Sequence, residues 1–277
     1  MVRRFLCGTV LLLCSSLLLA APPVRIAVII DDIGYHRARG LEALNLPGEI
    51  TAAVIPRSPH GPALARTATD MGREVIIHLP MAGNGLTLDP GGIRPDMAPE
   101  EIAAIVREAF KLVPTARGLN NHMGSVATRD DETMHWLMHE LASHQAFFID
   151  SRTTPDTVAE STARAHGLRT TGRDIFLDNE RDLLAINEQF NALLRIARRR
   201  GSAIAIGHPY PETLEYLARV LPLLADAGVE LVPVSALLPE AIMQASTRLA
   251  ADLPDTGETA VTDEQEAEHE HQQTVHR

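Results

Sequence analysis

The sequence predicts an α/β fold with a mainly parallel sheet, built as one barrel-like domain. Short runs rich in β-branched residues alternate along the chain with longer runs in which apolar residues return every three or four positions. This alternation is typical of repeated strand–helix units, whose strands lie parallel. About seven or eight strand runs follow one another without a clear linker, which fits one barrel-like domain better than two.

The predicted strands share an apolar, β-rich composition bounded by turn residues. In chain order they are 25–32 (RIAVIIDD), 49–56 (EITAAVIP), 74–81 (EVIIHLPM), 116–125 (ARGLNNHMGS), 146–152 (AFFIDSR), 170–178 (TTGRDIFLD), 202–209 (SAIAIGHP) and 229–237 (VELVPVSAL). The run at 170–178 carries the weakest strand pattern.

The clearest predicted helices occupy 99–113, 129–144, 183–200 and 211–228. Each repeats apolar residues at helical spacing. The first begins with acidic residues, which suit the positive end of the helix dipole, and the last closes on Gly228 as a helix stop.

The composition is that of an ordinary globular protein, with 277 residues, 45% of them hydrophobic and 22% charged. The formal net charge is −11, and the basic residues form only one short run, at 195–200. Nucleic-acid binding usually needs a basic stripe. We therefore expect no nucleic-acid partner and a substrate that is neutral or cationic.

The two ends of the chain differ from its middle. Arg3 and Arg4 precede an apolar run at 5–21, which is the layout of a secretory signal and is also nearly long enough for a membrane anchor. We expect residues 1–22 to be a signal peptide or signal-anchor, with an exported, periplasmic protein that an uncleaved segment would anchor to the inner membrane. The domain then spans 23–245, and 246–277 form a disordered acidic, His-containing tail.

Both cysteines, Cys7 and Cys14, lie in the N-terminal segment. The mature domain therefore has no thiol for a disulfide, a thiolate metal site or a cysteine nucleophile. Any metal site must be built from histidines and carboxylates.

Several predicted strands end on residues that can bind metal or transfer protons. These residues are Asp31, Asp32, His78, His122, Asp150, Arg152 and His208. The carboxyl ends of parallel strands meet at one edge of a sheet, so these side chains can share a site although they are distant in sequence. The Gly/Pro-rich loop 83–99 follows a strand on the same face.

Taken singly, each residue has a structural explanation: a histidine can be a hydrogen-bonded core residue, and an aspartate can cap a turn. As a set they favour a metal site. One carboxylate and two imidazoles form a three-ligand zinc site that leaves a position for water, whose pKa falls to near 7. Because side chains alternate along a strand, we expect Asp31 and Asp32 to diverge, one binding metal and the other acting as a base.

The runs IIDDIG, HLPM, NNHMGS, DSRT and IGHP, in this order, resemble the divergent polysaccharide deacetylase family, the YibQ-like branch of the NodB-type carbohydrate esterases. The resemblance covers roughly residues 25–238. It implies a distorted (β/α)7-type barrel of the NodB/polysaccharide deacetylase kind. It also implies a divalent metal, usually Zn²⁺, and hydrolysis of N-acetyl groups on sugars.

The same resemblance implies roles for single residues. Asp31 corresponds to the catalytic base, Asp32 to the metal-binding aspartate, and His78 to the first metal histidine. His208 corresponds to the late-strand histidine that acts as general acid. The family's usual second histidine, four residues after the first, is replaced here by Ala82.

His122 is therefore our candidate for the third metal ligand. The arginine-proline motif expected on the following strand is also absent, because this strand reads NNHMGS. We expect Arg152, beside Asp150, to take over the orienting role, since a guanidinium can hold a carboxylate in bidentate fashion.

Two functions follow from this interpretation. The first is a zinc-dependent deacetylase acting on a cell-envelope carbohydrate. The alternative is a catalytically inactive periplasmic carbohydrate-binding or scaffold protein on the same barrel, which the missing motifs favour. An aromatic content of 4% is low for a protein that binds a polymer by ring stacking. His135 and His139 lie one helical turn apart, and we interpret them as surface or packing residues rather than as a metal pair.

Overall fold

The fold is described by a computed structural model that covers residues 23–85 and 87–240. The predicted signal segment, 1–22, and the predicted tail, 246–277, lie outside the described residues, as does the end of the domain at 245. In the part of the chain that the structure describes, no helix combines the length and hydropathy needed to span a bilayer.

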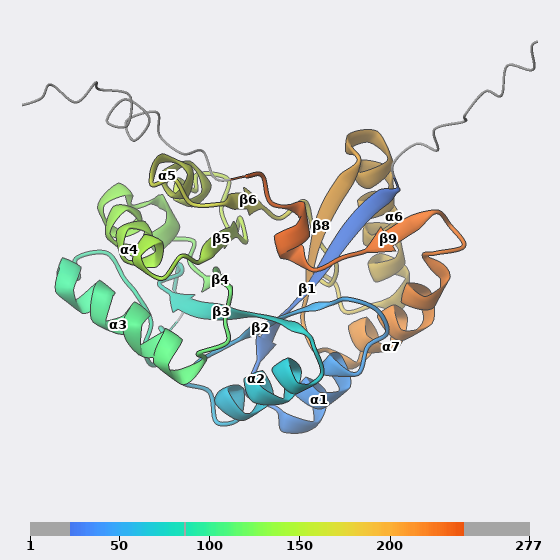
Figure 1. The fold of residues 1–277 in the computed structure, drawn as a ribbon, viewed down its shortest axis with the longest axis horizontal. Helices are drawn as coiled ribbons and strands as arrows, with labels where there is room; N and C mark the ends of the chain where they lie inside the picture. The colour runs from blue at the N-terminus through green and yellow to red at the C-terminus, as the bar shows by residue number, and fades with distance from the viewer. Residues whose placement is uncertain (1–22, 86, 241–277) are drawn as a thin grey trace, which may run out of the picture. The chain divides into compact units, whose positions relative to one another are not determined.

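One parallel sheet contains all the strands of the described residues (Figure 1). Its strands are β1 (Val24–Ile33), β2 (Thr51–Val54), β3 (Glu74–Met81), β4 (Gly118–Met123), β5 (Phe147–Asp150), β6 (Thr170–Gly172), β7 (Ile175–Phe176), β8 (Ser202–Gly207) and β9 (Val229–Leu231). Their order is β6-β5-β4-β3-β2-β1-β8-β7, and β9 pairs with β1. The predicted distorted α/β barrel is confirmed as a parallel half-barrel.

The predicted strand at 170–178 is two short strands at opposite ends of this order. Thr170–Gly172 pairs with β5, whereas Ile175–Phe176 pairs with β8. Between them, Arg173 N–H donates to the carbonyl of Asp150 and Asp174 N–H donates to the carbonyl of Ile204. β6 and β7 lie at opposite ends of the strand order and do not pair within the described residues. Arg173 and Asp174 therefore carry the chain across the open side of the half-barrel.

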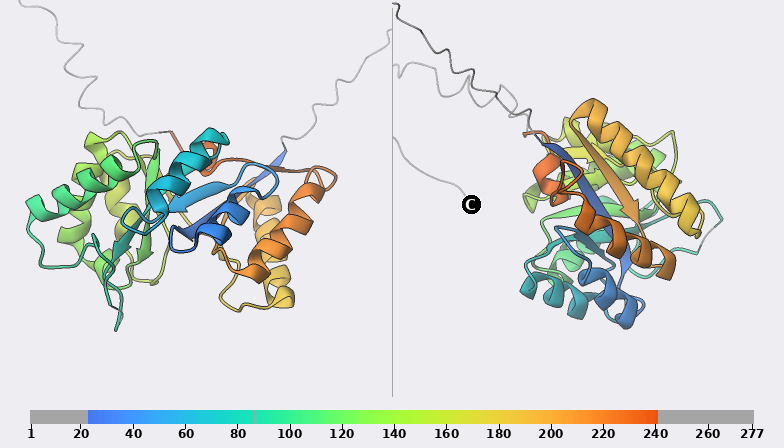
Figure 2. Two further views of the ribbon diagram at one scale, coloured as in Figure 1. Left: turned by 90° about the horizontal axis from the view of Figure 1, so that it is seen from below. Right: turned by 90° about the vertical axis from the view of Figure 1, so that its right-hand side faces the viewer.

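The helices cover the outer face of the sheet (Figures 1 and 2). They are α1 (Arg37–Leu44), α2 (Gly61–Asp70), α3 (Pro99–Leu112), α4 (Asp131–Ser143), α5 (Ala159–Ala165), α6 (Leu183–Arg200) and α7 (Pro211–Val220), with 3₁₀ turns η1 (Ala127–Arg129), η2 (Leu221–Leu223) and η3 (Val234–Leu237). In the right-hand view of Figure 2, α6 lies along β8.

Helix ends follow the sequence except at α7. Asp182 accepts the N–H groups of Leu184 and Ala185 and so begins α6, as the sequence predicts. The predicted helix at 211–228 instead ends at Val220 and continues as a 3₁₀ turn through Pro222, because proline has no N–H for an α-helical hydrogen bond.

Apolar side chains fill both faces of the sheet. The larger cluster packs the outer strand faces against the helices. The smaller cluster lies inside the curve of the sheet and includes Ile29, Ile76 and Ile149, with Val234 and Leu238 of the last segment packed against them. The base of the half-barrel is therefore filled, which leaves the polar strand ends to form the site.

Candidate metal centre

The two adjacent carboxylates at the end of β1 face the same imidazole. Asp32 has a left-handed φ of 55°, and the register between β1 and β2 shifts between Ile30 and Ile33. Asp31 Oδ2 lies 3.6 Å and Asp32 Oδ1 3.2 Å from the Nε2 atom of His78. The expected divergence of the two carboxylates is therefore wrong, because the bulge breaks the alternation of side chains.

His78 is buried on β3 and is oriented by Asn120 on β4. Asn120 Nδ2 donates to Asp31 Oδ1 at 2.8 Å and to Ser151 Oγ at 3.3 Å, so its carbonyl oxygen faces His78 Nδ1 at 2.8 Å. Nδ1 consequently carries a proton, and Nε2 is the nitrogen that faces Asp32 and is placed to bind a metal. Sequence reasoning missed Asn120, although the strand register that places it directly beside His78 also follows from the strand order.

His122 on β4 completes a group of three metal-ligating side chains. Its Nδ1 atom lies 2.8 Å from Asp32 Oδ1 and 3.1 Å from His78 Nε2. Asp32, His78 and His122 each offer one ligand atom, and these three atoms all lie within 4.8 Å of one another. The structure thus brings together the three predicted metal ligands.

The donor atoms fit a metal ion. Asp32 Oδ1 is buried and accepts no well-aligned hydrogen bond, although two imidazole nitrogens lie within 3.2 Å of it. Burial acts to lower the pKa of His78, but Asp31 and Asp32 outweigh it and raise that pKa, so His78 Nε2 would release a proton when a metal binds. Ligands around tetrahedral zinc, each ~2.0–2.1 Å from the ion, are about 3.3 Å apart, close to the separations of these three atoms. One carboxylate and two imidazoles form a donor set that Zn²⁺ accepts.

The two carboxylates titrate in opposite directions. Burial raises the pKa of Asp31, although His78, His208 and Asn120 all act to lower it. Burial also acts to raise the pKa of Asp32, but the imidazoles of His122 and His78, both close to its carboxylate, outweigh it and hold that pKa well below its ordinary value. Such a separation is typical of paired carboxyl groups with different tasks.

His208, which follows β8, is held by a buried carboxylate that the sequence analysis missed. Its Nδ1 atom lies 2.8 Å from Asp178 Oδ1, while Asp178 Oδ2 accepts the His208 N–H at 2.6 Å and the Thr213 hydroxyl at 2.8 Å. Burial alone would lower the pKa of His208, but Asp178, with smaller contributions from Asp32 and Asp31, raises it to about 9. The signal for Asp178 was its place at the end of the weak run 170–178.

Aromatic and cationic groups fix the plane of the His208 ring. Phe176 and Tyr210 stack on it, with ring centroids 6.0 Å and 5.3 Å away. The guanidinium groups of Arg173 and Arg181 lie 3.6 Å and 3.5 Å from the centroids of Phe176 and Tyr210, respectively. The imidazole is therefore fixed by stacking as well as by its hydrogen bond.

Asp150 and Arg152 do not join this centre. Asp150 is fully buried, and its carboxylate accepts the Arg152 N–H at 2.8 Å and the Thr157 hydroxyl at 2.9 Å. Arg152, whose backbone is left-handed with φ 48°, places Nη2 2.6 Å from Glu160 Oε2. Contrary to expectation, Arg152 therefore pairs with a helix residue instead of orienting a site carboxylate, and Asp150 holds the turn after β5.

The loop at 83–99 reaches the metal centre through Asp89. Its Oδ2 atom lies 3.4 Å from His122 Nε2 and accepts the Tyr35 hydroxyl at 2.7 Å. A carboxylate on the far nitrogen of a metal-binding histidine fixes the tautomer of the ring. The loop was predicted to lie on the site face, but neither Asp89 nor the role of Tyr35 followed from the sequence.

His135 and His139 lie away from this centre, on α4. Both are exposed, and His135 Nδ1 lies 3.2 Å from His166 Nε2 on the neighbouring α5 end. His139 is not part of a three-ligand group in the described residues. These contacts agree with a surface role.

Sequence comparisons identify the family. The family model described as divergent polysaccharide deacetylase matches residues 28–238. The chain is 39% identical over 254 residues to the uncharacterized protein YibQ of Escherichia coli (strain K12), covering 91% of this chain and 78% of the relative.

Solved structures show the same fold. The chain superposes on an uncharacterized protein from Agrobacterium tumefaciens C58 with a TM-score of 0.74 at 20% identity, covering 78% of this chain and 90% of the other. A CE4 family pseudoenzyme from Bacillus anthracis superposes with a TM-score of 0.53 at 14% identity, covering 79% and 66%. The family match, the relative and the shared fold lead to one conclusion: the chain belongs to the divergent polysaccharide deacetylase family.

Proposed function

We propose that this protein is a zinc-dependent hydrolase that removes N-acetyl groups from a cell-envelope carbohydrate in the periplasm. The observation that carries the proposal is the convergence of Asp32 Oδ1, His78 Nε2 and His122 Nδ1, with Asp31 beside them. Family membership supports a carbohydrate substrate. The choice of zinc rests on the donor set, and the choice of compartment rests on the N-terminal sequence.

A zinc ion at such a site supplies Lewis-acid stabilisation of a carbonyl oxygen and makes water acidic near neutral pH. The chain's own residues would manage the protons. Asp31 Oδ1 is held by Asn120, so Oδ2 is the oxygen that can accept a proton. The raised pKa of this buried carboxyl makes it a stronger base than an exposed aspartate.

His208 would serve at the other end of the reaction. With a pKa of about 9 it carries a proton at neutral pH, and its Nδ1–H is committed to Asp178. Its Nε2–H forms no hydrogen bond within the described residues and is the proton available for a leaving amine. Stacking on Phe176 and Tyr210 would hold this donor in a fixed direction.

The alternative is a barrel that binds a carbohydrate without turnover. Ala82 at the usual position of a metal histidine favours it. His122 offsets that loss, because its Nδ1 lies 2.8 Å from the carboxylate of Asp32. Metal binding alone would therefore not separate the two functions, whereas a base variant would.

The test measures metal content and acetate release on the purified full chain, with the tail histidines changed to glutamine in every sample. Those histidines are His269, His271 and His276. We expect about one zinc per chain in the parent, as a single site of three protein ligands requires. Asp32→Ala, His78→Ala and His122→Ala should each lose it, while the exposed-surface control His139→Ala should keep it.

Asp31→Asn then separates the hydrolase from the binding protein. In the hydrolase it keeps zinc but loses release of acetate from N-acetylated saccharides. A parent protein that takes up no zinc would refute the metal centre. A zinc-loaded parent that releases no acetate from any acetylated saccharide tested would refute the hydrolase and leave the binding protein.

A further inference from the structure

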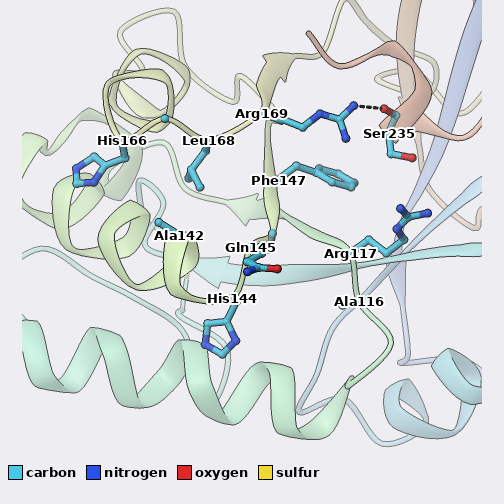
Figure 3. Close-up of a pocket in the computed structure, with 12 residues that line it drawn as sticks. Ala116, Arg117, Ala142, His144, Gln145, Phe147, His166, Leu168, Arg169 and Ser235 are labelled. Carbon is cyan, nitrogen blue, oxygen red and sulfur yellow. Dashed lines mark hydrogen bonds between the residues drawn. The ribbon is translucent and has the colours of Figure 1, made fainter. Parts of the chain in front are cut away.

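A second hollow lies where β4, β5 and β6 begin (Figure 3). The candidate metal centre lies at the other edge of the sheet, near the carboxyl ends of the strands. It has a volume of about 590 Å³, within the range of small-molecule sites. Its walls are the segments that lead into β4, β5 and β6, together with Ser235 of η3. Arg117, on its wall, precedes His122 by five residues of an extended strand, which is roughly 16 Å at 3.3 Å per residue.

The lining of this hollow is cationic, although the protein as a whole is acidic. Its positive charge comes from Arg117 and Arg169, and none of its lining residues is Asp or Glu. Of its two histidines, His144 pairs with Glu140, and burial, together with His135 and His139, lowers the pKa of His166. The formal charge of the whole chain is −11. A local excess of positive charge in such a protein concentrates anions at that place.

Neither arginine is neutralised by a carboxylate of the described residues. Arg169 donates to the carbonyl oxygens of Ser235, Leu238 and Pro239, at 2.8, 3.5 and 3.3 Å, which fixes the guanidinium without cancelling its charge. Arg117 is exposed, and its guanidinium forms no hydrogen bond or ion pair with the described residues. The Arg169 guanidinium is thus fixed in place, whereas the Arg117 side chain is free to contact a ligand.

Two carboxylates lie near the hollow, and neither pairs with its arginines. Glu140 pairs with His144, at 3.4 Å, and with Arg107, at 3.2 Å. Glu74 accepts the N–H of Ser235 at 3.1 Å and the Thr51 hydroxyl at 3.0 Å through Oε1, while its buried Oε2 accepts no hydrogen bond, and it forms an ion pair with neither Arg117 nor Arg169 within the described residues. They do not supply the missing counter-charge.

The strand register sets the span between the arginines. Phe147 N–H donates to the carbonyl of Arg117, and Phe148 N–H donates to the carbonyl of Arg169, so the two arginines flank the start of β5. Two strand spacings separate their backbones by about 10 Å, which two arginine side chains can bridge through one oxyanion. Figure 3 shows the Phe147 ring between them.

We propose that this hollow is a second binding site, for a small ligand carrying phosphate or carboxylate groups, held by Arg117 and Arg169 over the Phe147 ring. Guanidinium groups bind both kinds of oxyanion: Arg117 is free to do so in bidentate fashion, whereas Arg169, whose Nε and Nη2 donate to backbone carbonyls, offers Nη1. The site is independent of the metal centre and of any hydrolase activity.

The test is isothermal titration of the metal-free full chain with inorganic pyrophosphate and, separately, with citrate. We expect one saturable site for at least one of the two anions, with affinity that falls as salt is added. Binding of pyrophosphate alone identifies a phosphate-bearing ligand, and binding of citrate alone identifies a carboxylate-bearing ligand. Absence of saturable binding of both anions at millimolar concentrations overturns the proposal.

Variants locate the bound anion. Arg117→Gln should weaken binding about ten-fold or more, because it removes a charged hydrogen-bonding partner. Arg66→Gln, at an exposed arginine on α2, and Asp32→Ala, at the metal centre, should leave binding unchanged. Arg169→Gln should also weaken binding. Because Arg169 also holds the segment after η3, the thermal unfolding midpoint of this variant is measured alongside to show that it is folded. Binding that survives in Arg117→Gln but disappears in Asp32→Ala would place the anion elsewhere and overturn the proposal.

Discussion

Replacement of Asp178 by asparagine should remove most of the pH dependence that His208 contributes to stability. The His208 pKa is raised from 6.5 to about 9 in the folded chain. That displacement corresponds to about 3 kcal/mol of stability. Because the folded pKa is the higher one, this stability is fully present below pH 6.5 and is lost as the pH rises through about 9.

The substitution also has a cost that does not depend on pH. Asp178 Oδ2 accepts both the backbone N–H of His208 and the hydroxyl of Thr213, and an amide group cannot accept both together with the imidazole N–H. An unsatisfied buried donor costs about 1–3 kcal/mol. Asp178→Asn should therefore be less stable than the parent at every pH. The difference in the free energy of unfolding between parent and variant should narrow by about 2–3 kcal/mol from acidic to alkaline pH.

Urea unfolding of the metal-free protein, followed by circular dichroism from pH 6 to pH 10, measures this gap. Other titrating groups largely cancel in the comparison between parent and variant. His208→Gln, which keeps Asp178 in place, should show the same loss of pH dependence. A gap between parent and Asp178→Asn that stays constant across this range would refute the assignment of the raised His208 pKa to Asp178.

Three further substitutions test other parts of the structure. Asn120→Ala should weaken zinc binding about 10- to 100-fold in a competitive chelator titration, because His78 loses the acceptor that fixes its tautomer; unchanged affinity would contradict that role. Gly118→Ala should lower the free energy of unfolding by about 1–3 kcal/mol, since its Cβ would lie 2.3 Å from the Phe147 ring, and a variant as stable as the parent in urea would show that the ring moves freely. Arg152→Gln should leave zinc content unchanged and alter stability by less than about 1 kcal/mol, because it removes a partly exposed ion pair; loss of zinc would restore the orienting role first expected for this residue.

Patterns of hydrophobicity were sufficient to predict the strands and their parallel arrangement. Each buried strand is an apolar run bounded by turn residues, and the strand order places all carboxyl ends at one edge. The exception, 170–178, contains Arg173 and Asp174 at its centre. Backbone hydrogen bonds to β5 and β8 turn the chain there, and such long-range partners leave no periodicity in the sequence.

The cluster of Asp32, His78 and His122 was predictable because these are titratable residues at strand ends, whereas the residues that support it were not. Asn120 is an uncharged residue inside a strand, and its importance arises from the register that sets it beside His78. Asp178 lies 30 residues from His208 in the sequence. The role of Arg152 was predicted wrongly because its adjacency to Asp150 suggested a shared role, whereas its guanidinium pairs with Glu160 on α5.

Ala82 replaces the usual second histidine, and His122 on β4 lies close enough to His78 to take its place. The Ala82 carbonyl accepts the N–H groups of Val126 and Ala127, both at 3.0 Å, so this position ties the loop after β3 to the turn after β4. His122 lies opposite Pro80 in the β3–β4 register, two residues beyond the pairing of His78 with Asn120. The two candidate metal histidines thus lie on hydrogen-bonded neighbouring strands. Their separation is fixed by the sheet itself, so the three proposed ligands meet without the usual motif.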